Sequence, residues 1–188
     1  MNAQTMIAAP TVTNGVNVTQ LMGTIDAIKQ QPELARFEFR ATNRWIGGTQ
    51  NLATVKSYFG ACSEQVRAKP YQFLADEPPV LCGKDEGANP VEYLLSALSM
   101  CVTTTTVAHA ASRGIRIEAV DSELTGDLDV RGFLGMSNEV RKGYRRITMR
   151  MRVKTDASPE LLAQLAEYSP VHDVVSRSVP VELIVETY

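Results

Sequence analysis

Residues 89–114 read NPVEYLLSALSMCVTTTTVAHAASRG, and this stretch decides the fold. Asn89 is a typical N-cap residue, and Pro90 suits the first position of a helix. Gly114 stands where a helix commonly ends in a left-handed residue. The chain between these signals is largely apolar, so the sequence predicts one long apolar helix that ends near Ser112.

One part of this stretch opposes the helix. Val102–Val107 is a run of β-branched residues, which on intrinsic propensity alone favours a strand. The length of the stretch and its start and stop signals favour the helix instead. We therefore expect burial in the core to offset a propensity penalty of roughly a few kcal/mol.

The sequence on both sides of this helix predicts strands and shorter helices. The expected strands are Ala35–Trp45, Val55–Phe59, Tyr71–Leu74, Ile115–Leu128, Arg145–Thr155 and Val181–Thr187. The expected helices are Val18–Lys29, Pro159–Tyr168 and Pro170–Ser178, with long connections at 76–88 and 132–143. This order indicates an α+β fold. We expect a single domain over residues 1–188, in which residues 1–16 are loose and residues 18–31 form an N-terminal helical extension.

Length and charge exclude several classes of protein. The 188 residues match one domain of about 100–200 residues. A formal net charge of −2 gives no electrostatic reason to expect nucleic acid or an anionic membrane as a partner. The N-terminus lacks the pattern of a signal peptide, and no run approaches the ~18 apolar residues of a membrane span. The sequence therefore predicts a soluble cytoplasmic protein.

Few side chains are available for chemistry. The cysteines and histidines are Cys62, Cys82, Cys101, His109 and His172. They form neither C-x-x-C nor H-x-x-x-H, so no metal site is expected, and three cysteines do not make a disulfide framework. Phosphate-binding glycine loops, G-x-S-x-G and H-E-x-x-H are absent as well, and we expect no cofactor.

Cys101 is the strongest candidate for chemistry. It lies midway along the predicted helix, on a stripe with Leu98 and Thr105. Such a thiol is either a buried structural residue or a nucleophile, if a nearby cation lowers its pKa.

The segment SPVHD at 169–173 is the second candidate. Ser169 is either a plain N-cap or a residue placed at the positive end of a helix dipole, where a cysteine would be activated. His172 and Asp173 are adjacent, so their side chains do not face each other on a helix. His172 is therefore either a surface histidine or a group beside the thiol.

The remaining candidates rest on weaker patterns. Glu92 lies in the first turn of the long helix, where its interaction with the helix dipole is a sufficient explanation. Cys82 lies in a loop rich in proline and glycine, and is either incidental or a thiol that can meet Cys101. Cys62 is interpreted as incidental and His109 as structural.

Four short segments together carry a family resemblance. They are DEPP at 76–79, GANPVEYLLSALSMC at 87–101, SPVHD at 169–173 and PV at 180–181. In this combination the chain resembles the OsmC/Ohr family, the osmotically inducible and organic-hydroperoxide-resistance proteins, over roughly Phe37 to Glu186. The resemblance implies an OsmC-like α+β fold with antiparallel sheets. It also implies an intertwined homodimer around long central helices.

The resemblance also implies a chemistry. In the family peroxidases a first cysteine attacks a hydroperoxide, a second resolves the sulfenic acid as a disulfide, and a dithiol of the lipoyl type reduces that disulfide. Cys101 matches the first cysteine, and Glu92 matches a glutamate that helps to activate it. The chain departs from the pattern at two points, because Ser169 stands at the second cysteine and the family arginine falls near Asp76. These departures indicate a divergent branch.

Helix geometry limits how two of these residues can cooperate. Glu92 and Cys101 are nine residues apart, which is ~13 Å along an ideal helix and about half a turn out of phase. They cannot meet within one straight helix. Cooperation would need a dimer interface or an irregular helix.

The first hypothesis is a one-cysteine thiol peroxidase. Cys101 would attack an organic hydroperoxide, and Glu92 would orient a cation such as Arg40 or Arg44. His172 would lie beside the thiol. Cys82 or an external dithiol reductant would resolve the oxidised cysteine.

The second hypothesis is a non-catalytic homodimer on the same scaffold. It would bind a small apolar molecule at the dimer interface, and Cys101 would be a core residue. The serine at position 169 and the missing arginine favour this reading. A structural dimer with neither role is the third hypothesis.

Overall fold

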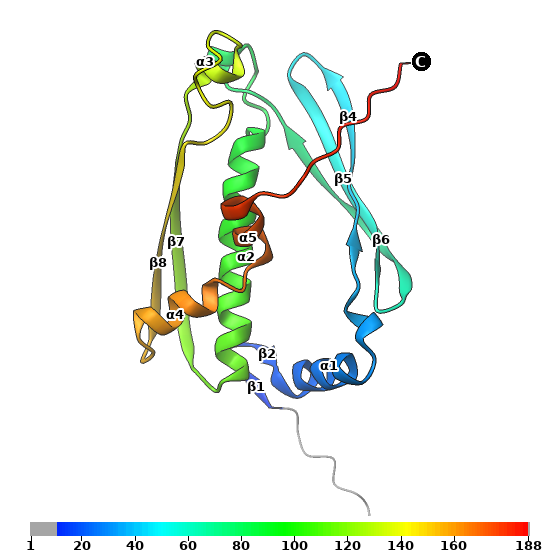
Figure 1. Cartoon of the computed structure of the whole chain (residues 1–188), viewed down its shortest axis with the longest axis vertical. Coiled ribbons are helices and arrows are strands. Elements are labelled where there is room, and N and C mark those ends of the chain that lie inside the picture. Colours follow the sequence, from blue (N-terminus) through cyan, green and yellow to red (C-terminus); the bar gives the residue numbers. More distant parts are fainter. Residues whose placement is uncertain (1–10, 188) are drawn as a thin grey trace, which may run out of the picture. The chain divides into compact units, whose positions relative to one another are not determined.

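The computed structural model describes residues 11–187, and Figure 1 shows their helices and strands in chain order. The chain divides into two compact units, with the boundary between Leu94 and Leu95. This boundary falls inside helix α2 (Pro90–Ser112), which begins in the first unit and continues in the second. The prediction of a single domain over residues 1–188 stays a prediction.

The first unit begins with a small hairpin and a helix. Strands β1 (Val12–Thr13) and β2 (Val16–Asn17) pair antiparallel through a turn in which residues 14 and 15 both have positive φ. Such turns match the twist of paired strands. The expectation of loose chain is therefore wrong for residues 12–16, and residues 1–10 lie outside the described part. Helix α1 (Val18–Gln30) confirms the predicted helical extension, and Asn17 caps it.

A meander of antiparallel strands completes the first unit. The 3-10 helix η1 (Pro32–Ala35) leads to β3 (Glu38–Phe39) and β4 (Thr42–Gly47). Both pair with β5 (Gln50–Gly60), which also pairs with β6 (Ser63–Ala75). The single strand predicted over Ala35–Trp45 is wrong, because two separate stretches pair with one long neighbour. β5 and β6 extend well beyond their predicted cores, since the ladder between them continues past the apolar residues.

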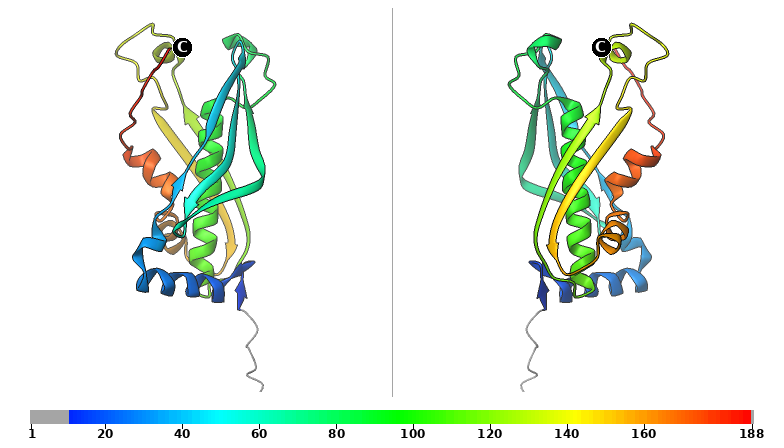
Figure 2. Two further views of the ribbon diagram at one scale, coloured as in Figure 1. Left: turned by 90° about the vertical axis from the view of Figure 1, so that its right-hand side faces the viewer. Right: turned by 90° about the vertical axis from the view of Figure 1, so that its left-hand side faces the viewer.

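The second unit contains the rest of α2, a two-stranded sheet and two helices. Strands β7 (Ile117–Asp127) and β8 (Arg146–Thr155) form an antiparallel ribbon, seen as a long twisted pair in Figure 2. Helices α4 (Pro159–Ala166) and α5 (Pro170–Arg177) follow. All of these elements confirm the predicted ones within a few residues. The β-branched run stays helical, and Val102 and Thr106 from it are buried.

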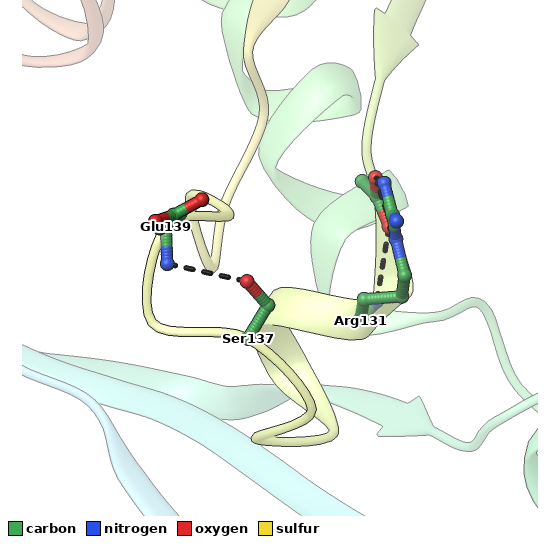
Figure 3. A network of polar contacts seen from close by, with 4 residues as sticks. Arg131, Ser137 and Glu139 are labelled. Atoms are coloured by element: carbon green, nitrogen blue, oxygen red, sulfur yellow. Dashed lines mark hydrogen bonds and ion pairs between the residues drawn. The ribbon is translucent and has the colours of Figure 1, made fainter.

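The connection between β7 and β8 is more ordered than the predicted long loop. It starts with the short helix α3 (Val130–Phe133), capped by Asp129. Asp129 also forms an ion pair with Arg131, with an N–O distance of 2.6 Å. Farther along, the backbone N–H of Glu139 donates to Ser137 Oγ at 3.3 Å (Figure 3).

The last predicted strand is absent. Residues 181–187 are assigned to no helix or strand, although their sequence is typical of a strand. A strand requires a neighbouring strand to pair with its backbone, and residues 11–187 supply none for the segment. Its apolar side chains are consequently exposed; they are Val181, Leu183, Ile184 and Val185.

Helix α2 is long and apolar enough to cross a membrane by length and composition alone. A helix in the core of a soluble protein passes the same test. The buried residues of α2 are Leu98, Val102, Thr106, Ala110 and Ala111. They recur mainly at four-residue steps, which is the pattern of a helix packed along one face.

Candidate functional site

The start of α2 is fixed by a reciprocal pair of hydrogen bonds. Asn89 Oδ1 accepts from the Val91 backbone N–H at 2.9 Å, and Glu92 Oε2 accepts from the Asn89 backbone N–H at 2.9 Å. This arrangement is a variant of the capping box, in which the N-cap oxygen accepts from the second residue of the helix and not from the third. Glu92 is exposed, and its carboxylate binds the backbone N–H of Asn89 at the start of the helix. It lies in the first turn, as the sequence predicts.

Asp76, the first residue of the predicted connection at 76–88, is almost completely buried, with 1% of its surface exposed. Its carboxylate accepts from Thr49 Oγ1 at 2.6 Å and from Gln50 Nε2 at 3.2 Å. It also accepts from the backbone N–H groups of Glu77, Lys84 and Glu86. The Thr49 hydroxyl, followed by the backbone N–H groups of Glu77 and Glu86 and the Gln50 amide, holds the pKa of Asp76 well below its usual range, against the opposing effect of burial. A buried anion therefore organises the loop near the place where the family resemblance put an arginine.

Glu77 is a second acid in this loop, and its pKa is shifted in the opposite direction. Burial, together with the nearby charges of Asp76 and Glu92, raises the pKa of Glu77 above its ordinary value. Asn89 Nδ2 donates to the Glu77 carboxylate. The burial of Asp76 and Glu77 is not predicted from the sequence. The available signal is that these two acids stand directly before two prolines, at the end of a strand.

The two proposed activating arginines differ in their surroundings. Arg40 donates to Glu38 at 2.7 Å and makes a two-pronged contact with Glu64 at 2.8 and 2.9 Å. The Glu64 contact is the main cause of the raised pKa of Arg40. Arg44 lies exposed on β4, opposite Leu52 on β5. Arg40 is therefore already paired with two carboxylates.

All three cysteines are free thiols. Cys62 is exposed at the turn between β5 and β6. Cys82 is exposed as well, and ends the 3-10 helix η2 (Pro79–Leu81) in a left-handed conformation with φ of 67°. Cys101 is half-buried on α2, directly before the buried Val102.

A cavity of about 620 Å³ lies in the second unit, between α2, β8, α4 and α5. Its lining residues are Val102, Met149, Met151, Val153, Thr155, Ala157, Pro159, Leu162, Ala163, Ala166, Glu167 and His172. Met149, Met151 and Val153 alternate along β8, so they share one face of the strand. The cavity is mainly apolar, with Glu167 and His172 as its ionisable groups. The size suits a small organic ligand.

Ser169 and His172 are held together at the start of α5. Ser169 is fully buried, and its Oγ accepts from the His172 backbone N–H at 3.3 Å. Ser169 is thus an N-cap, as one of the two sequence interpretations held. His172 is half-buried and lines the cavity. Its place beside the Cys101 thiol stays a prediction.

His109 lies in the last turn of α2. Its ring stacks on Tyr168 with centroids 4.5 Å apart, and Arg113 Nη1 donates to the His109 backbone carbonyl at 2.9 Å. Burial, and then the Arg113 charge, lower the pKa of His109 below its ordinary value. These contacts agree with the structural role expected from the sequence.

The candidate residues fall into two groups. Glu92, Cys82, Arg40 and Arg44 belong to the first unit, whereas Cys101, Ser169 and His172 belong to the second. The cooperation of Glu92 or Cys82 with Cys101 stays a prediction. The cavity-lining methionines and Glu167 are not predicted from the sequence as site residues. The predicted strand Arg145–Thr155 carries a signal for the methionines, because alternate side chains of a strand share one face.

These features define a class of α+β protein with a free cysteine on a long apolar helix and an apolar cavity lined in part by the same helix. Residues 83–184 match the model of the OsmC-like protein family. The chain therefore belongs to the OsmC-like family. No curated protein matches the sequence. Within residues 11–187 there is no cluster of three or more His, Cys, Asp or Glu side chains that could hold a metal ion.

Solved structures share the fold. An OsmC-like protein from Mycoplasma pneumoniae has a TM-score of 0.56 at 18% identity, covering 74% of this chain and 88% of that one. An OsmC-like protein of unknown function from Vibrio cholerae has a TM-score of 0.54 at 14% identity, covering 77% and 95%. At these identities the likeness establishes a common fold. The OsmC-like α+β fold predicted from the sequence is confirmed.

Proposed function

We propose that this protein is a thiol-dependent redox protein that reduces organic hydroperoxides through Cys101, as part of a response to oxidative stress. The observation that carries the proposal is the position of Cys101. It is a free, half-buried thiol on α2, directly before Val102 in the sequence, and Val102 is one of the residues that line the apolar cavity. An apolar cavity suits the organic part of a hydroperoxide, and His172 on its wall is an ionisable group.

The proposed cycle begins with the Cys101 thiolate, which attacks the terminal oxygen of the hydroperoxide. The O–O bond breaks, the released alkoxide takes a proton to become an alcohol, and Cys101 becomes a sulfenic acid. One thiol of an external dithiol then displaces water from the sulfenic sulfur. The second thiol displaces Cys101, which returns to the thiol form as the reductant becomes a disulfide.

Roles for the other residues follow from their surroundings. We assign to His172 the donation of the proton that converts the alkoxide into the alcohol. Cys82 is the alternative resolving thiol, and its exposure makes it accessible. Of the two arginines Arg44 is the better candidate cation, because Arg40 is already bound by two glutamates. Glu92 would have to leave its capping contact to orient it.

The test is turnover of cumene hydroperoxide with dihydrolipoamide as reductant, combined with trapping of a sulfenic acid by a cyclic 1,3-dione. We expect turnover and an adduct on Cys101, with both lost in Cys101→Ser. Cys62→Ser is the matched control and should retain wild-type activity. Cys82→Ser shows whether Cys82 resolves the sulfenic acid. Absence of turnover and of an adduct in the wild-type protein contradicts the proposal.

The cavity also favours a second candidate function, the non-catalytic binding of a small apolar molecule. It is supported by the apolar lining and by Ser169, a capping serine where a resolving thiol would stand. The probe is 1-decanol, measured by calorimetry. Binding by the wild type, its loss in the cavity-filling Val102→Trp, and no hydroperoxide turnover would favour this function over the first.

We propose a cytoplasmic homodimer as the working form. The support is a large set of exposed apolar side chains in both units, because contact with a second copy would remove their surface from water. Among them are Phe39, Trp45, Tyr71, Val80, Met100, Val181, Leu183 and Val185. Light scattering after size exclusion should give about twice the chain mass, and a monomer mass at micromolar concentration contradicts the dimer. Cell fractionation tests the location.

A further inference from the structure

Arg67 on β6 is held in an unusual way. Its guanidinium carbon lies 5.0 Å from the ring centroid of Tyr58 and 5.5 Å from that of Tyr71. Both distances are within the range of cation–π attraction. Within residues 11–187 its Nη1 is buried and has no hydrogen-bond partner. The two rings therefore orient a cation that no carboxylate of the described chain neutralises.

The rings around Arg67 continue into a larger aromatic cluster. The centroids of Phe39 and Tyr58 are 5.6 Å apart, and those of Phe37 and Phe39 are 5.8 Å apart. We call Phe37, Phe39, Tyr58 and Tyr71 the aromatic face. Phe39 is 71% exposed and Tyr71 is 60% exposed. A cation amid exposed rings is a surface suited to a segment that carries both apolar side chains and a carboxylate.

The C-terminal segment of the chain has that composition. Residues 179–187 read VPVELIVET, with Glu182 and Glu186 among apolar residues. Val181 is 86% exposed and Leu183 is 83% exposed. In an extended chain Glu182 and Glu186 lie on the same side, and Leu183 on the other. The segment thus offers a carboxylate and apolar side chains, and it has no strand partner within residues 11–187.

We propose that Arg67 and the aromatic face receive the C-terminal segment of a second copy of this chain, with Glu182 or Glu186 paired to Arg67. The inference rests on the homodimer proposed above and adds a specific contact to it. Because the two rings already fix the guanidinium, little side-chain freedom is lost when the carboxylate binds. The charge complementarity then fixes where along the sheet the segment docks.

The test is a charge exchange followed by sedimentation equilibrium. Arg67→Glu should weaken dimerisation roughly tenfold or more, and the double variant Glu182→Arg/Glu186→Arg should do the same. Combining all three changes should restore the dimer to within a few-fold of the wild type. Lys69→Glu is the matched control, since it makes the same change in charge at an exposed position on the same strand.

The outcomes separate this contact from the dimer itself. A wild-type dimer that persists in Arg67→Glu, or that the combined exchange does not restore, overturns the contact and leaves the dimer standing. A wild-type monomer overturns both. If the combined exchange restores thermal stability in a protein that stays monomeric at every concentration, the contact forms within one chain. That outcome overturns the second copy as the occupant. If Arg67→Glu does not fold, the exposed tail variants carry the test.

Discussion

Two buried hydroxyl groups of the second unit differ in whether they have a hydrogen-bond partner. Ser169 and Thr106 are both fully buried. Ser169 Oγ accepts a hydrogen bond from the His172 backbone, whereas Thr106 Oγ1 has no partner within residues 11–187. A buried hydroxyl without a partner loses its hydration and gains nothing in return.

Thr106→Val should therefore stabilise the protein by about 1 kcal/mol, because the change removes the unsatisfied hydroxyl and retains the branched shape. The measurement is the free energy of unfolding from urea titration. Thr104→Val is the matched control on the exposed side of the same helix, and should change stability by less than about 0.5 kcal/mol. A Thr106→Val variant less stable than the wild type contradicts the prediction.

His109 predicts a pH dependence. Its pKa is lowered in the folded state, so the unfolded chain binds more protons as the pH falls. The stability associated with His109 is thus present above the unfolded pKa of about 6.5 and is lost as the pH falls through the folded pKa. The urea midpoint should decrease between pH 7.5 and pH 5.5.

The decrease should be smaller in His109→Gln. The variant His172→Gln, which keeps His109, serves as the comparison and should retain most of the slope. Equal slopes in the wild type and in His109→Gln would show that His109 does not cause the dependence.

At the scale of elements, α4 and α5 begin in the same way but in different environments. Ser158 and Ser169 each precede a proline, and each accepts from the backbone N–H three residues later at 3.3 Å. Ser158 is exposed, whereas Ser169 is buried. Water can replace the first cap but not the second.

Ser158→Ala should accordingly cost about 1 kcal/mol, and Ser169→Ala should cost more, up to about 3 kcal/mol, because it leaves a buried N–H unpaired. Both values come from urea titration. Ser169→Thr retains the cap oxygen and should recover part of the loss. Equal costs for the two alanine variants would show that burial of the cap does not matter.

The elements themselves were largely predictable. Helix α2 was found with its observed ends, because Asn89, Pro90 and Gly114 are local signals that need no tertiary contact. The split of Ala35–Trp45 into β3 and β4 could not be predicted, because it depends on which residues pair with β5. The strand expected at the C-terminus failed for a related reason, since a strand exists only where a partner strand is available.

At the scale of the whole molecule, the exposed C-terminal segment, residues 179–187, is the part that we assign to contact with a second copy. Deleting the chain from Val179 onward should shift the protein from dimer to monomer, because it removes the apolar residues and carboxylates assigned to the partner contact. Light scattering after size exclusion measures the mass. A truncated chain that keeps the dimer mass of the full chain contradicts this role.

The sequence by itself determined the α+β class, the long helix with Cys101 at its middle, and the Ser-Pro starts of α4 and α5. These features depend on local propensity, capping and hydrophobic period, which neighbouring residues decide. Only the tertiary structure decided the burial of Asp76, the cavity lined by Val102 and His172, and the packing of Arg67 against the rings of Tyr58 and Tyr71. Those features join residues distant in sequence, and their energies come from burial and geometry that arise only when the chain is folded.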